Sequence, residues 1–238
     1  MFMTAFPPTR HSIVAAIRSD RTDLRRSAFD TLVTAYWKPV FKYVRLKWHT
    51  SPDDSADLTQ AFFLRAFEKD FFAGFDPSRA RFRTYLRTCL DGFVSNARKA
   101  DARLKRGGAV TLVPIDVEEA ERELRYQSTN AIDDYDAYFH REWLRGLFAS
   151  AASRLRDACA ARGRAARFAM FELYDLAGED GDRPTYGDLA QRLGLSATDV
   201  TNELAAARRE FRRLVIEVLR EQCTTDEEFE AEARALTG

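Results

Sequence analysis

The chain has 238 residues, equal numbers of acidic and basic side chains, and a formal net charge of +0. Its hydrophobic content of 45% and charged content of 31% are typical of a core-forming protein and argue against a disordered chain. The sequence has no run of about eighteen apolar residues and no secretory-type N-terminus. We therefore expect a cytoplasmic protein without membrane insertion.

Carboxylates and tyrosines are abundant, but no spacing typical of a metal site or a catalytic centre occurs. The three cysteines (Cys89, Cys159 and Cys223) lie far apart, and the three histidines form no HxH or HxxxH pair. No phosphate-binding loop or His–acid pair occurs. We expect reduced thiols, no metal, no cofactor and no enzymatic activity.

The neutral total conceals two blocks of opposite charge. From Asp76 to Arg106, nine basic residues against three acidic ones give +6. From Asp116 to Glu142, three basic residues against nine acidic ones give −6. Net charge therefore says little about the partners of this chain.

Apolar residues recur with a helical period along most of the chain, and no strand-like alternation is longer than a few residues. Pro39 is expected to kink the first long helix or to start a new one. The predicted fold is all-α, with two helical domains joined by an acidic linker. We expect an N-terminal helical domain at 1–108, the linker at 109–137, a C-terminal helix-turn-helix domain at 138–222 and an acidic tail at 223–238.

The segment from Leu189 to Val215 predicts a helix-turn-helix. Ala190, Gly194 and Val200 suit the helix crossing, a left-handed turn and the seat of the second helix. Ser196 and Asp199 form a capping box, which starts the second helix near Ala197. Such a helix enters a DNA groove with its first turns and contacts phosphates farther along. The predicted DNA-binding residues here are Ser196, Thr198, Asp199, Thr201, Asn202, Arg208, Arg209 and Arg212, with Arg213 a further phosphate contact.

A plainer interpretation of that segment remains open, because any compact helical hairpin carries small and apolar residues at useful places. Glu203 and Glu210 would also repel phosphates if they faced DNA.

The basic block contains a helix in which aromatic residues alternate with arginines. Aromatic rings stack on unpaired bases while Arg and Lys hold the backbone. The alternative is a core stripe of Phe82, Leu86 and Leu90 with a solvated basic face. The candidate DNA-binding residues of this helix are Arg81, Arg83, Tyr85, Arg87, Arg98 and Lys99.

Upstream, "DDSADLTQAFFLRAF" places acidic residues just before Gln60. Acids in a first turn complement the helix dipole. They also give this helix an acidic face that suits a basic protein partner.

These segments together resemble bacterial RNA polymerase sigma factors of the extracytoplasmic-function type. The resemblance rests on "DDSADLTQAFFLRAF", "FDPSRARFRTYLRTCL" and the C-terminal helix-turn-helix, and it extends from about Phe29 to Leu236. "KRGG", "HREW" and the "YGDLA" start are similar to a long-linker lineage common in planctomycete- and acidobacterium-like genomes.

The resemblance implies a factor that binds core RNA polymerase and directs it to promoter DNA. It implies that Arg83, Tyr85 and the basic helix melt and read the promoter, and that Ser196 to Arg213 read an element farther upstream. An anti-sigma factor or a Ser/Thr kinase is a further expected partner. The residues expected to dock on the polymerase are Asp54, Asp57, Thr59, Gln60 and Phe63.

The sequence departs from the family at Ala56, where a carboxylate is common. This absence beside a hydroxyl residue motivates the hypothesis that phosphorylation of Ser55, or of Ser51 or Thr59, restores the negative charge. The family's usual Trp is replaced by Tyr85, and the second helix of the helix-turn-helix is less basic than usual.

Two other functions stay open at this point. One is a stand-alone helix-turn-helix regulator with a ligand-binding helical domain. The other is a degenerate sigma-like protein that binds polymerase or an anti-sigma partner without initiating transcription. The acidic linker and tail either fold over the basic helices and suppress DNA binding, or act as solvated segments.

Overall fold

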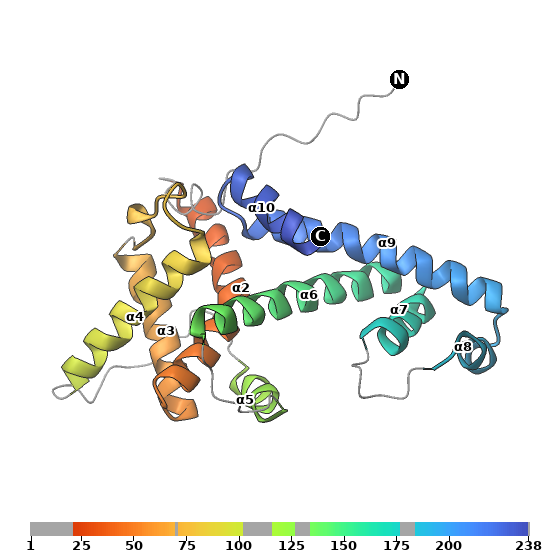
Figure 1. The fold of residues 1–238 in the computed structure, drawn as a ribbon, viewed down its shortest axis with the longest axis horizontal. Helices are drawn as coiled ribbons and strands as arrows, with labels where there is room; N and C mark the ends of the chain where they lie inside the picture. The colour runs from red at the N-terminus through yellow and green to blue at the C-terminus, as the bar shows by residue number, and fades with distance from the viewer. Residues whose placement is uncertain (1–20, 70, 102–115, 127–133, 177–183, 238) are drawn as a thin grey trace, which may run out of the picture. The chain divides into compact units, whose positions relative to one another are not determined.

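The computed structural model describes residues 21–69, 71–101, 116–126, 134–176 and 184–237. All regular structure in these ranges is helical, which confirms the predicted all-α class (Figure 1). None of the helices there combines the length and hydropathy that a membrane crossing requires.

The chain divides into two compact units. Unit 1 takes the chain as far as Gly146 together with Glu221–Gly238, and unit 2 is Leu147–Arg220. The predicted boundary at 108/109 lies outside the described residues. The predicted boundary at 137/138 falls instead inside helix α6 (Tyr135–Ala161). The helix is continuous because buried residues recur along it every four positions: Phe139, Trp143, Leu147, Ala151 and Leu155.

Unit 1 begins with three helices that share an aromatic core. These are α2 (Thr22–Lys47), α3 (Pro52–Glu68) and α4 (Phe82–Asp101), with the 3₁₀ turn η1 (Phe71–Gly74) before α4. Helix α2 continues through Pro39, so no new helix starts there. Rings from all of these elements are buried and contact one another, among them Phe29, Phe62, Phe63, Phe72 and Phe82.

Helix α3 starts at a strong sequence signal. The Ser51 side chain accepts a hydrogen bond of 3.1 Å from the amide of Asp54, and Pro52 takes the first helical position. Asp53 and Asp54 lie in the first turn, where negative charge complements the helix dipole. This cap fixes the first turn of α3, whose acidic residues the sequence analysis predicted to face a basic protein partner.

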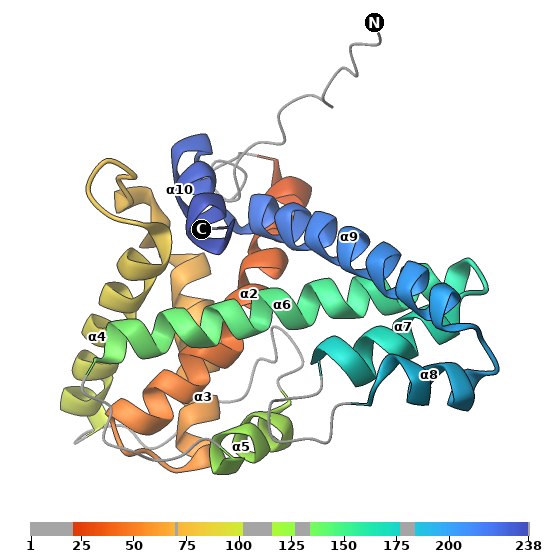
Figure 2. The same ribbon diagram turned by 45° about the vertical axis from the view of Figure 1, so that its right-hand side comes forward.

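The predicted linker contains a helix, α5 (Val117–Tyr126), which packs within unit 1 beside α2 and α3 (Figures 1 and 2). Its apolar residues are few, but Val117, Ala120 and Leu124 recur on one face and pack against Phe41 of α2. Around this contact its acids meet three cations of α2, in the pairs Glu119–Lys38, Glu123–Lys42 and Glu121–Arg45. The expectation of a spacer was therefore wrong for this stretch.

Unit 2 contains the second part of α6, α7 (Ala165–Phe171), the π-helical turn η2 (Glu172–Leu176), α8 (Tyr186–Leu193) and most of α9 (Ala197–Gln222). Its core is formed by apolar residues that point inward from these helices: Leu155, Phe168, Phe171, Leu189, Val200, Leu204 and Ala207.

The predicted tail at 223–238 is not a separate segment. It forms helix α10 (Asp226–Thr237), which belongs to unit 1 and lies near the start of α4 in both ribbon views (Figures 1 and 2). Its hydrogen bonds to α4 join residues 146 positions apart in sequence.

Candidate functional site

The turn between α8 and α9 has the local geometry that the sequence predicted. Gly194 ends α8 with a φ of 65°, in the left-handed region that glycine adopts without strain. The amide of Asp199 donates to Ser196 Oγ at 3.1 Å, and the amide of Ser196 donates to the Asp199 carboxylate at 3.2 Å. This reciprocal cap confirms the predicted start of the second helix.

The first turns of α9 present polar side chains around one buried anchor. Val200 is fully buried, whereas Thr198, Asp199, Thr201 and Asn202 are exposed. The hydrogen bonds from Ser196 also hold the pKa of Asp199 below its usual value, so this carboxylate stays ionised near neutral pH. The four predicted residues are therefore accessible to solvent on the first two turns of α9.

Arg208 has a structural role that the sequence did not reveal. Its guanidinium donates two hydrogen bonds of 2.9 Å to the Asp175 carboxylate and lies 5.4 Å from the centre of the Tyr174 ring. It therefore joins α9 to η2 and is not free for a phosphate. Arg209 and Arg212 are exposed and form no ion pair within the described part of the chain, so they remain suitable phosphate contacts.

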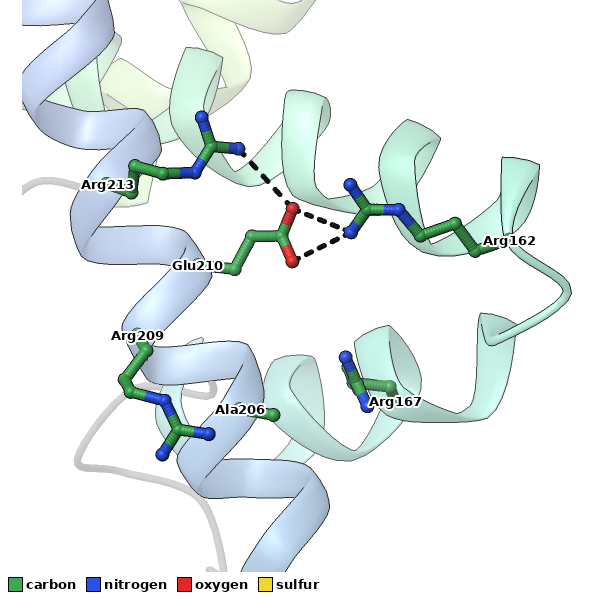
Figure 3. Close-up of a pocket in the computed structure, with 6 residues that line it drawn as sticks. All are labelled: Arg162, Arg167, Ala206, Arg209, Glu210 and Arg213. Carbon is green, nitrogen blue, oxygen red and sulfur yellow. Dashed lines mark hydrogen bonds and ion pairs between the residues drawn. The ribbon is translucent and has the colours of Figure 1, made fainter. Parts of the chain in front are cut away.

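The two glutamates that would repel DNA are neutralised by arginines. Glu203 pairs with Arg167 of α7, and the hydrogen bond from Arg167 lowers the pKa of Glu203. Glu210 accepts two hydrogen bonds of 2.9 Å from Arg162 and lies 3.4 Å from Arg213 (Figure 3). The surface hollow around these groups is lined by Arg162, Arg167, Ala206, Arg209, Glu210 and Arg213, so positive charge dominates it.

The candidate residues at the start of α4 are engaged inside unit 1. Arg83 is 9% exposed and pairs with Glu232 of α10, and Arg81 pairs with the same carboxylate at 2.7 Å. The Tyr85 hydroxyl donates to the carbonyl of Phe71 at 2.7 Å, which fixes its ring against η1. In this conformation Arg83 is buried and the Tyr85 ring is fixed, whereas Arg81 is paired but 46% exposed.

The remaining α4 candidates divide into two kinds. Arg87 forms ion pairs with Asp91 and Asp136 and is half-buried. Arg98 and Lys99 are exposed near the other end of the helix, with Arg98 5.4 Å from the Trp48 ring centre. Since a helix rises about 1.5 Å per residue, Arg98 lies roughly 22 Å along the axis from Arg83. The six candidates therefore do not form one patch.

The predicted polymerase-docking residues separate into surface and core. Asp54 and Asp57 are exposed, and Gln60 is half-buried. Thr59 and Phe63 are 0% and 1% exposed, and Thr59 donates its hydroxyl to the carbonyl of Ser55 at 2.7 Å. Thr59 and Phe63 pack in the core behind α3, so of the five predicted docking residues only Asp54, Asp57 and Gln60 reach the surface.

Ser55 is a poor phosphorylation site in this structure. It is 0% exposed, and its hydroxyl donates to the carbonyl of Ser51 at 2.7 Å. Thr59 is equally buried, so a kinase would have to unfold the first turns of α3 to reach either group. The exposed Ser51 is the accessible hydroxyl among the three, although it caps α3.

Ala56 faces apolar side chains of α2 and α5. It is partly buried and packs against the apolar cluster of Phe41, Ala120 and Leu124. A charged side chain here would be desolvated against α5. The small apolar residue therefore fits the docking of α5, a relationship that local sequence patterns do not reveal.

The described residues contain no group of three or more His, Cys, Asp or Glu side chains that could hold a metal ion. Cys89, Cys159 and Cys223 form no disulfide with one another. Burial is the main cause that raises the pKa of Cys89 and of Cys159, so both favour the neutral form.

Comparisons with known protein families, characterised proteins and solved structures found no match to this chain.

Proposed function

We propose that this chain is an RNA polymerase sigma factor that binds core polymerase and directs it to promoter DNA. The proposal starts from the resemblance in sequence to the extracytoplasmic-function type. It assigns polymerase docking to the exposed face of α3 and upstream promoter reading to the start of α9.

The observation that carries the proposal is the start of α9. Thr198, Asp199, Thr201 and Asn202 are exposed together, the cap at Ser196 fixes their helix, and Val200 anchors it from below. Arg209 and Arg212 continue the same helix with unpaired positive charge among the described residues. This combination supports contact with base edges by one part of the helix and with phosphates by the next.

The docking half of the proposal is supported by charge and exposure on α3. Asp57 is exposed one helical turn before the half-buried Gln60, and it forms no ion pair with another described residue. The carboxylates of such a surface attract a basic partner and fix its orientation.

Co-migration with bacterial core RNA polymerase on a sizing column tests the docking half. The wild-type chain is expected to co-migrate, whereas Asp57→Ala and Gln60→Ala are expected to lose most of this binding. Glu68→Ala, an exposed acid at the end of the same helix, is the matched control and should bind like the wild type.

Failure of the wild-type chain to bind would contradict the proposal. Tight binding of duplex DNA by the chain alone at physiological salt would then favour the stand-alone regulator. Polymerase binding without any new transcript would favour the degenerate sigma-like protein.

A further inference from the structure

The start of α4 holds a carboxylate from α10. The backbone amide of Phe82, the first residue of α4, donates to Glu228 Oε1 at 2.9 Å. The other oxygen of Glu228 accepts from the amide of Thr224 at 2.9 Å and from its hydroxyl at 2.6 Å. One carboxylate therefore serves the starts of two helices, its own and α4.

A second carboxylate from α10 binds beside the first. Glu232 is 2% exposed, accepts a hydrogen bond from Arg83 and forms an ion pair of 2.7 Å with Arg81. The guanidinium of Arg83 also lies 5.2 Å from the centre of the Trp143 ring, which holds it in place. The two glutamates are one helical turn apart, so a single face of α10 carries both.

Together these donors form a binding site for anions. It combines an amide at a helix N-terminus with two guanidiniums, and both kinds of group bind phosphate as well as carboxylate. The occupants in this structure are carboxylates of the chain itself. The same donors include two of the residues that the sequence predicted to bind DNA, Arg81 and Arg83.

We infer that α10 acts as an internal competitor for single-stranded DNA, with Glu228 and Glu232 at the positions that backbone phosphates take when α10 leaves. The inference takes its ligand from the proposed function, because promoter melting is what presents single-stranded DNA to α4. In the free chain the site is closed, and binding of DNA at the start of α4 requires α10 to move away.

Because Arg83 is buried, replacement of Glu232 by a phosphate is more favourable than departure of α10 without a replacement. Departure of Glu232 alone would leave a buried guanidinium without a counter-charge, which is strongly unfavourable. A phosphate that enters as Glu232 leaves satisfies the same donor. The closed form therefore persists without nucleic acid, and a strand that supplies phosphates shifts the population toward the open form.

The test measures binding of a fluorescent single-stranded oligonucleotide to the full chain by anisotropy, without polymerase. The variants are Glu232→Gln and the double variant Glu228→Gln with Glu232→Gln. If the open form is about 1–10% of the wild-type population, removal of the competing charges tightens apparent binding about ten- to hundredfold. The salt dependence should also steepen, by about 0.7 in the logarithmic slope for each phosphate gained.

The matched control is Glu227→Gln with Glu230→Gln, which removes the same charge from exposed positions of the same helix. It should leave binding within about twofold of the wild type. Arg81→Gln added to the double variant should abolish most of the gain, because it removes a donor of the site. Helix content from circular dichroism and one hydrogen–deuterium exchange profile per variant report whether unit 1 stays folded.

A gain that is limited to the Glu228 and Glu232 variants and depends on Arg81 supports the inference. Unchanged binding in folded variants overturns it, as does an equal gain in the control or a gain for duplex DNA alone. If the double variant unfolds, binding by the single variant Glu232→Gln is judged by the same criteria. This variant is expected to stay folded, because the glutamine side chain still offers an acceptor to Arg83. Because polymerase is absent, this result is independent of the co-migration experiment, so failure of the inference and failure of the proposed function are distinguishable.

Discussion

The ammonium group of Lys42 lies 2.6 Å from the carboxylate of Glu142, and both side chains are only 1% exposed. The pair joins α2 to α6 inside unit 1 across 100 residues of sequence. Lys42 also contacts Glu123 of α5 at 2.5 Å. One buried cation thus holds together three helices of unit 1.

Lys42→Met is expected to destabilise the protein by about 1.5–3 kcal/mol, because the buried Glu142 loses one of its two cation partners and keeps Arg145. Urea unfolding followed by tryptophan fluorescence measures this, since all three tryptophans lie in unit 1. Adding Glu142→Gln should recover part of the loss, because the neutral amide is less costly to bury than a carboxylate that has lost one of its cations. A loss below about 1 kcal/mol for Lys42→Met would show that the pair contributes little.

Neighbouring arginines of α9 are expected to behave differently when replaced by alanine. Arg208→Ala should lower stability by about 1 kcal/mol, since it removes a bidentate pair that is partly exposed. Arg209→Ala should leave stability unchanged and weaken DNA binding with a shallower salt dependence. Thermal unfolding and anisotropy on promoter duplex in the polymerase complex separate the two effects. Equal stability losses would refute the assignment of Arg208 to the contact between α9 and η2.

Ala56→Asp is expected to loosen α5, because the new carboxylate would be desolvated against Ala120 and Leu124. The measurement is hydrogen–deuterium exchange of residues 117–126, which should lose protection while α2 keeps it. Ala61→Asp places the same charge on an exposed position of the same helix and should leave α5 protected. Full protection of α5 in Ala56→Asp would contradict the packing described for Ala56.

Unit 2 should lose stability in acid. The hydrogen bond from Arg167 lowers the pKa of Glu203, and bonds at the helix starts lower the pKa values of Asp188 and Asp199. Each carboxylate therefore stabilises the fold above its unfolded pKa of about 4, and this contribution is lost as pH falls through the lower folded value.

Amide exchange of residues 197–207 between pH 6 and pH 3.5, corrected for intrinsic rates, measures this loss of stability. Glu203→Gln should reduce the pH dependence, because one of the three carboxylates no longer titrates. A variant with the same acid sensitivity as the wild type would show that the Arg167–Glu203 pair does not contribute.

Local features of the fold could be predicted from the sequence, whereas distant pairings could not. Gly194, Ser196 and Asp199 are close in sequence, so their residue types alone predict the turn and the cap that the structure has. By contrast, the hydrogen bond between Arg208 and Asp175 joins residues 33 positions apart, and the one between Phe82 and Glu228 joins residues 146 positions apart. A basic residue on a helix has the same local pattern whether it faces solvent or an acid brought by another helix.

The packing of α5 and α10 could not be predicted either, because it also depends on residues that are distant in sequence. Both are short, strongly acidic helices with few apolar residues, so their patterns resemble those of solvated segments. Cations from distant parts of the sequence help to fix both helices: Lys38, Lys42 and Arg45 for α5, beside its apolar contact with Phe41, and Arg81 and Arg83 for α10.

The most direct test of the proposed function is transcription in vitro from fragmented genomic DNA by core polymerase, with and without the chain, followed by mapping of the RNA 5′ ends. The account predicts discrete new 5′ ends that depend on the chain and share sequence elements upstream. Asn202→Ala should reduce them, while Gln191→Ala, an exposed change on α8, should not. If the 5′ ends are the same with and without the chain, although the chain is folded and active polymerase is present, the sigma-factor account is contradicted.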